Sequence, residues 1–275
     1  LKDSTLYVNL EPCNHYGKTP PCTDIILKYK IKNVVIGSSD PNRMVEGGGI
    51  KRLEAKGCNV TYGVLENECN HLNKRFLTYH KQKRPYVILK WAESNDGFIS
   101  PIKSEREVYW ISGDKSKKLS HGWRSEEHSI LVGVQTIIDD DPMLTTRLVD
   151  GKNPIRIILD PNCRIPVKSK VFSKDSKTII LSKTKNNSIE KNIRIINYDK
   201  MEFILRSLYD LKLQSVIIEG GAKTIKNFLD HDSWDSIRIF KSNQNLKNGI
   251  KSPEIDISEF EKTIIGDDIL YEFER

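Results

Sequence analysis

The chain has 275 residues, which is long for the roughly 100–200 residues of a single domain, so we expect two compact units. With 37% hydrophobic and 29% charged residues it has an ordinary globular composition, and no stretch approaches the roughly 20 apolar residues of a membrane helix. The formal net charge is +7, but the lysines are scattered rather than gathered on one helix among aromatic residues. This pattern disfavours nucleic acid and membrane partners and favours a small phosphorylated molecule.

The first 83 residues alternate between short strands and helices. In chain order we predict a strand at 5–11, a helix at 23–30, a strand at 33–39, a helix at 49–57, a strand at 59–65 and an amphipathic helix from about 66 to 82. On that last helix Leu72, Phe76 and Tyr79 are expected to share one face. The alternation predicts a layered α/β unit with a largely parallel sheet.

A domain boundary is predicted at residues 81–85, where a basic stretch ends in Pro85 and the helix cannot continue. We therefore divide the chain into residues 1–83 and 84–275. In the second part we predict strands at 86–93, 129–134, 155–160, 178–182, 193–198, 215–220, 236–240 and 269–274, with a loop at 139–147. Helices are predicted near 114–127, at 201–211 and after the glycine turn at 220–221.

The sequence opens on Leu1 in place of a methionine, and a short polar turn leads directly into a strand. We therefore expect a fragment that lacks the beginning of its first domain, with no secretory signal peptide. The five cysteines form an odd set without the density of a secreted disulfide scaffold, which favours a reducing, cytoplasmic location.

Two cysteines flank a loop between a predicted strand and a helix. Cys13 follows the first strand, and Cys22 lies in the first helical turn, where backbone N–H groups and the helix dipole favour a thiolate. Thiolates bind zinc, and a catalytic zinc site commonly has three protein ligands and a water. A third ligand is therefore required. A pair of buried structural thiols is the alternative interpretation.

The segment EPCNHYGKTPPC around this pair resembles the zinc deaminase half of the bifunctional deaminase/reductase family of riboflavin biosynthesis. The resemblance implies that Cys13 and Cys22 bind zinc and that His15 contacts the substrate, with a solvated loop histidine as the alternative. In that family a His-x-Glu motif supplies the third ligand and the Glu that shuttles protons. No His-x-Glu precedes Cys13, so we expect this chain by itself not to deaminate.

The segment VIIEGGAKTIKNFL places two glycines between a strand and a helix. A helix N-terminus reached through a glycine turn can bind phosphate, although such a turn taken alone is more often just a tight connection, and GxGxxG is absent. The segments RPYVILKWAESNDGFI, HGWRSEEHSILVGVQTIIDDDPMLTTR and NPIRIILD precede it. In this order the four segments resemble the reductase half of the same family.

The resemblance implies the C-terminal part of a cytidine-deaminase-like three-layer domain, followed by a dihydrofolate-reductase-like domain that uses NADPH. The residues implied to contact NADPH are Ala92, Trp110, Thr136, Asp140, Gly221, Ala222, Lys223, Thr224, Ile225, Lys226 and Asn227. Those implied to contact the substrate are Arg124, Leu144, Arg147 and Glu219. Arginine forks suit the ribose 5-phosphate and Glu219 the sugar hydroxyls. A solvated Arg124, a turn-forming Asp140 and a core Trp110 are the structural alternatives.

The chain departs from the family pattern at two places. Val108 stands where the family commonly has a serine two residues before Trp110, which removes one expected substrate hydrogen bond. After Trp234 the family's usual ending is replaced by SIRIFKSNQNLKNGI. A homodimer is expected from the resemblance alone.

The implied function is two consecutive steps on one phosphoribosylamino-pyrimidine. Zinc-dependent hydrolysis removes an amino group, and NADPH then reduces the ribosyl unit to ribityl. We expect this chain to retain the reductase step. The alternatives are a stand-alone reductase with an inactive deaminase-like platform, and an RNA-binding module on a deaminase fold. The absence of a clustered basic stripe argues against the RNA-binding module.

Overall fold

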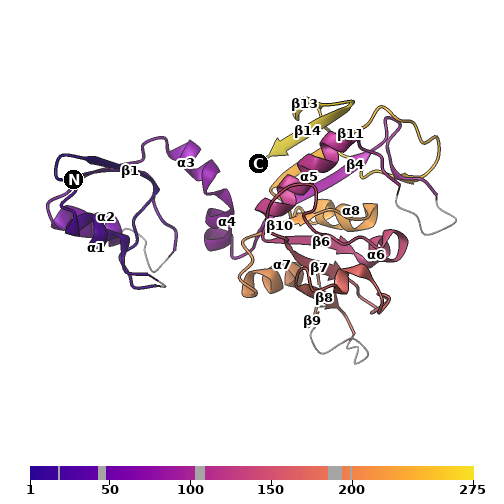
Figure 1. Ribbon diagram of the computed structural model, residues 1–275, viewed down its shortest axis with the longest axis horizontal. Coiled ribbons are helices and arrows are strands. Elements are labelled where there is room, and N and C mark those ends of the chain that lie inside the picture. Colours follow the sequence, from indigo (N-terminus) through magenta and orange to yellow (C-terminus); the bar gives the residue numbers. More distant parts are fainter. Residues whose placement is uncertain (18, 43–47, 103–108, 185–193, 199) are drawn as a thin grey trace. The chain divides into compact units, whose positions relative to one another are not determined.

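The computed structural model describes residues 1–275 except 18, 43–47, 103–108, 185–193 and 199 (Figure 1). Val108 therefore lies outside the described residues. The chain forms two compact units, Leu1–Arg84 and Pro85–Arg275, and each is described by itself.

The first unit is a small parallel α/β layer structure. Its strands are β1 (Thr5–Leu10), β2 (Asn33–Ser38) and β3 (Asn59–Tyr62), paired in parallel in the order β1-β2-β3. Its helices are α1 (Cys22–Lys28), α2 (Gly48–Ala55), α3 (Glu66–Leu72) and α4 (Lys74–Gln82). Successive strand residues face opposite sides of the sheet, so Ile36 packs in the core with Ile26 of α1 and Leu53 of α2. The next residue, Gly37, faces α3, where an added Cβ would collide with the Cys69 side chain.

The single helix predicted over residues 66–82 is two helices. The chain leaves helical geometry at Asn73, with φ −97° and ψ 12°, and the Asn73 side-chain amide donates to the Cys69 carbonyl at 2.9 Å. The Cys69 carbonyl also accepts the Asn73 backbone N–H at 3.0 Å, so the side-chain bond accompanies the break without displacing a helical hydrogen bond. The predicted apolar face is therefore wrong: Leu72 is 65% exposed, and the buried residues are Leu77 and Thr78 of α4.

The second unit is built on a larger, mostly parallel sheet. In the described residues its strand order is β13-β14-β11-β4-β10-β6-β7-β8-β9, with β14 antiparallel to its neighbours β11 and β13 and the remaining pairs parallel. The bounds of these strands are β4 Tyr86–Glu93, β6 Ser129–Gly133, β7 Ile155–Leu159, β8 Thr178–Ser182, β9 Arg194–Asn197, β10 Ser215–Ile218, β11 Ser236–Lys241, β13 Glu261–Ile265 and β14 Asp268–Glu274. Two short strands, β5 (Phe98–Ser100) and β12 (Ile250–Lys251), pair separately.

Helices cover both faces of this sheet. They are α5 (Asp114–Glu126), α6 (Val134–Asp140), α7 (Met201–Asp210) and α8 (Ala222–Asp230), with a short 3-10 turn at Lys170–Phe172. One core joins α7 and α8 to strand residues such as Leu89 and Val216, and a second joins α5 and α6 to Ile88 and Ile217. Strands buried on both faces are continuously apolar, which is why the sequence predicted them well.

Two details bear on the prediction. Helix α6 was not predicted, because its sequence VQTIIDD continues the apolar run of β6 without a break. Within the described residues, none of the helices has the length and apolar character needed to cross a membrane.

Candidate active site

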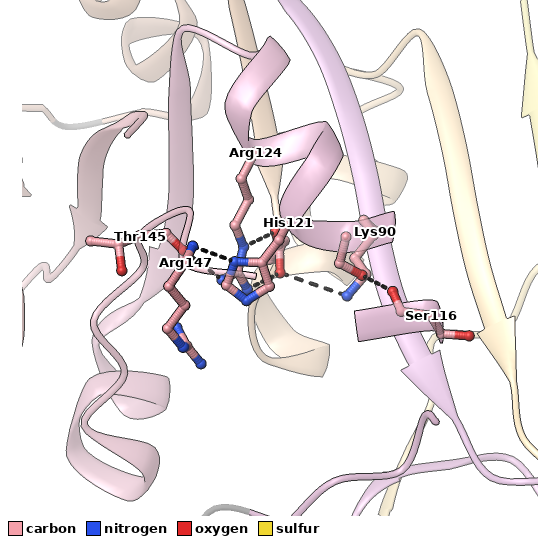
Figure 2. A network of polar contacts seen from close by, with 8 residues as sticks. Lys90, Ser116, His121, Arg124, Thr145 and Arg147 are labelled. Atoms are coloured by element: carbon pink, nitrogen blue, oxygen red, sulfur yellow. Dashed lines mark hydrogen bonds and ion pairs between the residues drawn. The ribbon is translucent and has the colours of Figure 1, made fainter. Parts of the chain in front are cut away.

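Charged side chains gather where neighbouring parallel strands of the second unit end. Glu219 directly follows β10, and Lys90 lies in the middle of β4 at the level where the shorter β10 ends, one residue after the Leu89–Ile218 pair. Helix α5 supplies His121 and Arg124, and the segment after α6 supplies Arg147 (Figure 2). The carboxyl ends of strands in open α/β sheets are where ligands bind.

The centre of this group is an ion pair between Glu219 and Arg124. The guanidinium donates from Nε to Oε1 and from Nη2 to Oε2, each at 2.7 Å, in the two-pronged geometry that carboxylates and arginines favour. The Lys90 ammonium lies 3.6 Å from Glu219 Oε2. The side chains of Glu219, Lys90 and Arg124 are 6%, 12% and 14% exposed, so the charges interact with little screening by solvent.

The electrostatics of the group favour a fully ionised Glu219. Burial alone would raise the pKa of its carboxyl, but the positive charges of Arg124 and Lys90 outweigh burial and lower that pKa to about 2. Burial lowers the pKa of Lys90, and Glu219 opposes that shift. Lys90, Arg124 and Arg147 together outnumber the single carboxylate of Glu219, so the group has surplus positive charge for an anionic ligand.

His121 connects the helix to the Arg147 segment. Its Nδ1 accepts a hydrogen bond from the Arg147 backbone N–H at 3.1 Å, and its Nε2 lies 3.5 Å from Arg124 Nη1. Arg124 Nη1 also donates to the Thr145 carbonyl at 3.3 Å. Burial, with the charges of Arg124 and Arg147, lowers the pKa of His121 to about 4, so the ring is neutral at neutral pH.

Of the four substrate residues predicted in the second unit, the structure brings Glu219, Arg124 and Arg147 together, but Leu144 differs. The Leu144 side chain is buried in the α5/α6 core, and its backbone has φ +52°, which is strained for a leucine. Any contact of Leu144 with a ligand would therefore come from its backbone.

Sequence reasoning missed Lys90 and His121. The signals were a lone lysine inside the apolar strand YVILKWAE, and a histidine three residues before Arg124, hence on the same face of the helix.

The glycine turn lies beside this network and faces the start of α6. Gly221 has φ +60°, and a Cβ added to it would lie 3.6 Å from Thr136 Oγ1. A Cβ on Gly133 would lie 2.5 Å from Thr224 Oγ1, so glycine is needed for this close approach. Helix α8 begins at Ala222, and its first N–H groups are therefore available to an anion.

The other predicted cofactor residues are placed less uniformly. Ala92 lies near the end of β4, and Asp140 lies one helical turn after Thr136 on the same face of α6. Trp110 is 49% exposed just before α5, with the Lys117 ammonium 4.7 Å from its ring centre. Along α8, Ile225 is in the core and Lys226 pairs with Asp230 on the surface, so neither side chain is placed to hold a phosphate. Lys223 and Asn227 lie on the same helix.

The thiols of the first unit lie together. The Cys22 backbone N–H donates to Cys13 Sγ at 3.3 Å, and both cysteines are free of disulfides. Burial and the neighbouring Cys13 raise the pKa of the Cys22 thiol, opposite to the effect predicted from the helix terminus. His15 lies in the same loop, and its Nδ1 is buried.

Two thiols are suitable zinc donors, but they make only part of a site. The described residues contain no cluster of three or more His, Cys, Asp or Glu side chains that could hold a metal ion. Among the described residues, the side chains that surround Cys13 and Cys22 therefore do not complete a zinc site.

A glycine turn and a cationic group at the carboxyl edge of a mostly parallel sheet are the arrangement in which α/β enzymes commonly bind anionic small molecules. Residues 85–242 match the model of the RibD C-terminal domain. Over 291 aligned residues the chain is 37% identical to riboflavin biosynthesis protein RibD of Aquifex aeolicus, covering 100% of this chain and 81% of that protein. The chain belongs to the RibD family of riboflavin biosynthesis enzymes.

Solved structures agree with this assignment. A diaminohydroxyphosphoribosylaminopyrimidine deaminase/5-amino-6-(5-phosphoribosylamino)uracil reductase of Thermotoga maritima is 36% identical with a TM-score of 0.88, covering 98% of this chain and 79% of that one. RibD of Acinetobacter baumannii is 27% identical with a TM-score of 0.86, covering 98% and 80%. The predicted fold class, a mixed α/β chain with a deaminase-like and a dihydrofolate-reductase-like part, is confirmed.

Proposed function

We propose that this chain catalyses the NADPH-dependent reduction of the ribosyl side chain of a phosphoribosylamino-pyrimidine to ribityl, the second of the two activities named for the Thermotoga relative. The observation that carries the proposal is the buried Glu219–Arg124 pair with Lys90 beside it, next to the Gly221 turn. A polar, positively charged group beside a helix N-terminus suits a phosphorylated sugar and a dinucleotide.

The substrate would be held by the charged network. Both Glu219 oxygens are already engaged by Arg124, which fixes the carboxylate in one orientation toward the sugar hydroxyls. Because Glu219 occupies the guanidinium group of Arg124, we assign the phosphate chiefly to Arg147, whose side chain is exposed. Arg124 would contribute its positive charge to the attraction of the phosphate. This refines the prediction that gave both arginines the same role.

The cofactor would lie across the Gly221 turn, with its phosphates at the start of α8 and near Thr136. NADPH supplies a hydride when bound. Reduction at the sugar C1′ would break its bond to the ring oxygen, and that oxygen would need a proton to become a hydroxyl. We assign Lys90 as the proton donor, because its lowered pKa makes the ammonium a better acid.

We propose no deaminase step for this chain by itself. Cys13 and Cys22 would hold zinc once a third ligand and a proton-shuttling carboxylate complete the site. A homodimer remains a proposal from the family resemblance.

The test follows NADPH oxidation by absorbance with the deaminated pyrimidine substrate. We expect turnover by the native chain, and Arg147→Met should raise the substrate KM about ten-fold or more while leaving the NADPH KM near its native value. Arg206→Met, at an exposed α7 pair with Asp210, is the matched control. Absence of NADPH oxidation by the folded native chain would reject the proposal.

A further inference from the structure

The chain's divergent ending after Trp234 contains a segment, residues 242–252, that lies along the connection between β4 and α5. We call it the clamp segment. Its strand β12 pairs with β5, and the Asn95 N–H donates to the Gln244 carbonyl at 2.7 Å. The Asp96 carboxylate accepts the N–H groups of Leu246 at 3.0 Å and Lys247 at 2.7 Å. Residues 95–100, which follow β4, are therefore bonded to this segment at several points.

The side chain of Gln244 forms hydrogen bonds with the residues on either side of Trp110. Its Oε1 accepts from the Tyr109 hydroxyl at 3.3 Å, and its Nε2 donates to the Ile111 carbonyl at 3.2 Å. These partners are the residues directly before and after Trp110. A carbonyl can only accept, so the amide nitrogen must face Ile111, and a carboxylate at position 244 would fail there.

Trp110 differs from the other tryptophans of the chain. It is 49% exposed, whereas Trp91, Trp123 and Trp234 are 4%, 7% and 7% exposed. The family resemblance implies that Trp110 contacts NADPH. An exposed indole that contacts a ligand gains from being held in one orientation before the ligand arrives, because less conformational entropy is lost on binding.

We propose that Gln244 is a positioning residue of the reductase, which acts through the backbone and side chains flanking Trp110 to hold that indole against NADPH. The inference rests on the proposed function and on the NADPH contact that the family resemblance implies for Trp110. It assigns a role to a part of the sequence that the family resemblance does not explain.

The test measures NADPH affinity by fluorescence titration of the whole chain. Gln244→Ala and Gln244→Glu should each weaken NADPH binding about 3- to 10-fold, the effect of losing one or two hydrogen bonds. The substrate KM should stay unchanged, because Arg147 and Glu219 are not among the contacts of Gln244. Asn248→Ala, at an exposed residue of the clamp segment, is the matched control and should bind NADPH like the native chain.

A second readout separates positioning from general stability. Acrylamide quenching reports mainly on Trp110, and Trp110→Phe identifies its share of the signal. Gln244→Ala should increase that share and reduce its protection by NADPH, without shifting the melting temperature enough to explain the loss.

Two outcomes are distinguishable failures. If the native chain binds NADPH and Gln244→Ala binds it equally well with unchanged quenching, the inference fails and the proposed function stands. If the native chain binds no NADPH, both fail. Should Gln244→Ala not fold, Tyr109→Phe decides, since it removes one hydroxyl and should still weaken NADPH binding about two-fold or more.

Discussion

Each unit of the molecule has a buried glutamate as the first residue after a parallel strand, and the two are satisfied differently. Glu11 follows β1 and accepts the N–H groups of Gly49 at 3.0 Å and Ile50 at 3.1 Å, at the start of α2. Glu219 follows β10 and is satisfied by the side chains of Arg124 and Lys90. Glu11 is 3% exposed, and the Glu219 side chain is 6% exposed.

The difference shows how the same position in a fold serves structure or chemistry. Backbone N–H groups cannot turn toward a ligand, so Glu11 fastens a helix to a strand. Arginine and lysine side chains bring net charge, which leaves surplus positive charge around Glu219. Both glutamates are buried because they directly follow a parallel strand, and they differ in whether their partners are backbone N–H groups or charged side chains.

The largest effect is expected when the ion pair of Glu219 is broken. Arg124→Met leaves the buried Glu219 carboxylate with Lys90 alone, and removing one partner of a buried ion pair typically costs about 3–5 kcal/mol. We expect this loss of unfolding free energy together with loss of reductase activity of about 100-fold or more. Denaturant titration followed by tryptophan fluorescence suits the measurement, because Trp91, Trp110, Trp123 and Trp234 all lie in the second unit.

The control for this variant is Arg206→Ala, which removes an exposed pair with Asp210 and should change the free energy of unfolding by no more than about 0.5 kcal/mol. Equal effects of the two substitutions would contradict the distinction between a buried network and a surface pair.

A matched pair of substitutions sharpens the comparison directly. Glu11→Gln places an amide NH2 opposite backbone N–H donors and should cost about 1–3 kcal/mol in the first unit, with reductase kinetics unchanged. Glu219→Gln weakens the pairing with Arg124 and should lower kcat/KM about 10- to 100-fold. Thermal unfolding by circular dichroism and steady-state kinetics on both variants make the test. A kinetic loss in Glu11→Gln would place Glu11 in the reductase chemistry after all.

A smaller effect is expected from pH, and it distinguishes His121 from Glu219. The pKa of His121 falls from 6.5 to about 4 in the fold, so between these values the unfolded chain binds a proton that the folded chain does not. Stability should therefore fall as pH drops from about 6.5 to 4. The pKa of Glu219, lowered from 4.5 to about 2, adds a second loss as pH falls from about 4.5 toward 2.

Denaturant midpoints measured between pH 7 and pH 3, again by tryptophan fluorescence, check this sign. His121→Asn retains an oxygen that can accept the Arg147 N–H but does not titrate, so it should flatten the upper part of the profile and leave the lower part. An unchanged slope above pH 5 in that variant would assign the loss to another group.

Most of the second unit could be predicted from the sequence because each of its central strands is a continuous apolar run. Ile217 and Ile88 are buried on a sheet covered by helices, and such strands are continuous apolar runs whatever their order in the sheet. Motif order predicted Glu219, Arg124 and Arg147, which the structure brings into one network. The cofactor and substrate roles assigned to these residues stay predictions.

What the sequence could not predict depends on partners far along the chain. Lys90 is buried because β4 lies between β10 and β11, whose residues are more than 100 positions away. His121 depends on the Arg147 backbone, 26 residues away, and Gln244 on Tyr109, 135 residues away. Periodicity carries no information about such pairs. The break at Asn73 is local, but it lies in the backbone angles of one residue, which hydrophobic spacing does not indicate.

The last prediction is that loss of metal or of a thiol in the first unit leaves reductase activity unchanged. It tests whether the two units are chemically separate. The residues assigned to reduction lie within Pro85–Arg275, and the candidate zinc thiols lie within Leu1–Arg84. Treatment with a zinc chelator, or Cys13→Ser, should therefore leave kcat and both KM values of NADPH oxidation within about two-fold of the native chain. Cys58→Ser, which places a hydroxyl in the core of the first unit, is the control for destabilisation without loss of a candidate ligand. If chelation stopped the reductase while Cys58→Ser stayed active, metal at Cys13 and Cys22 would support the second site. Glu11 and Glu219 would then belong to two units that depend on each other for activity.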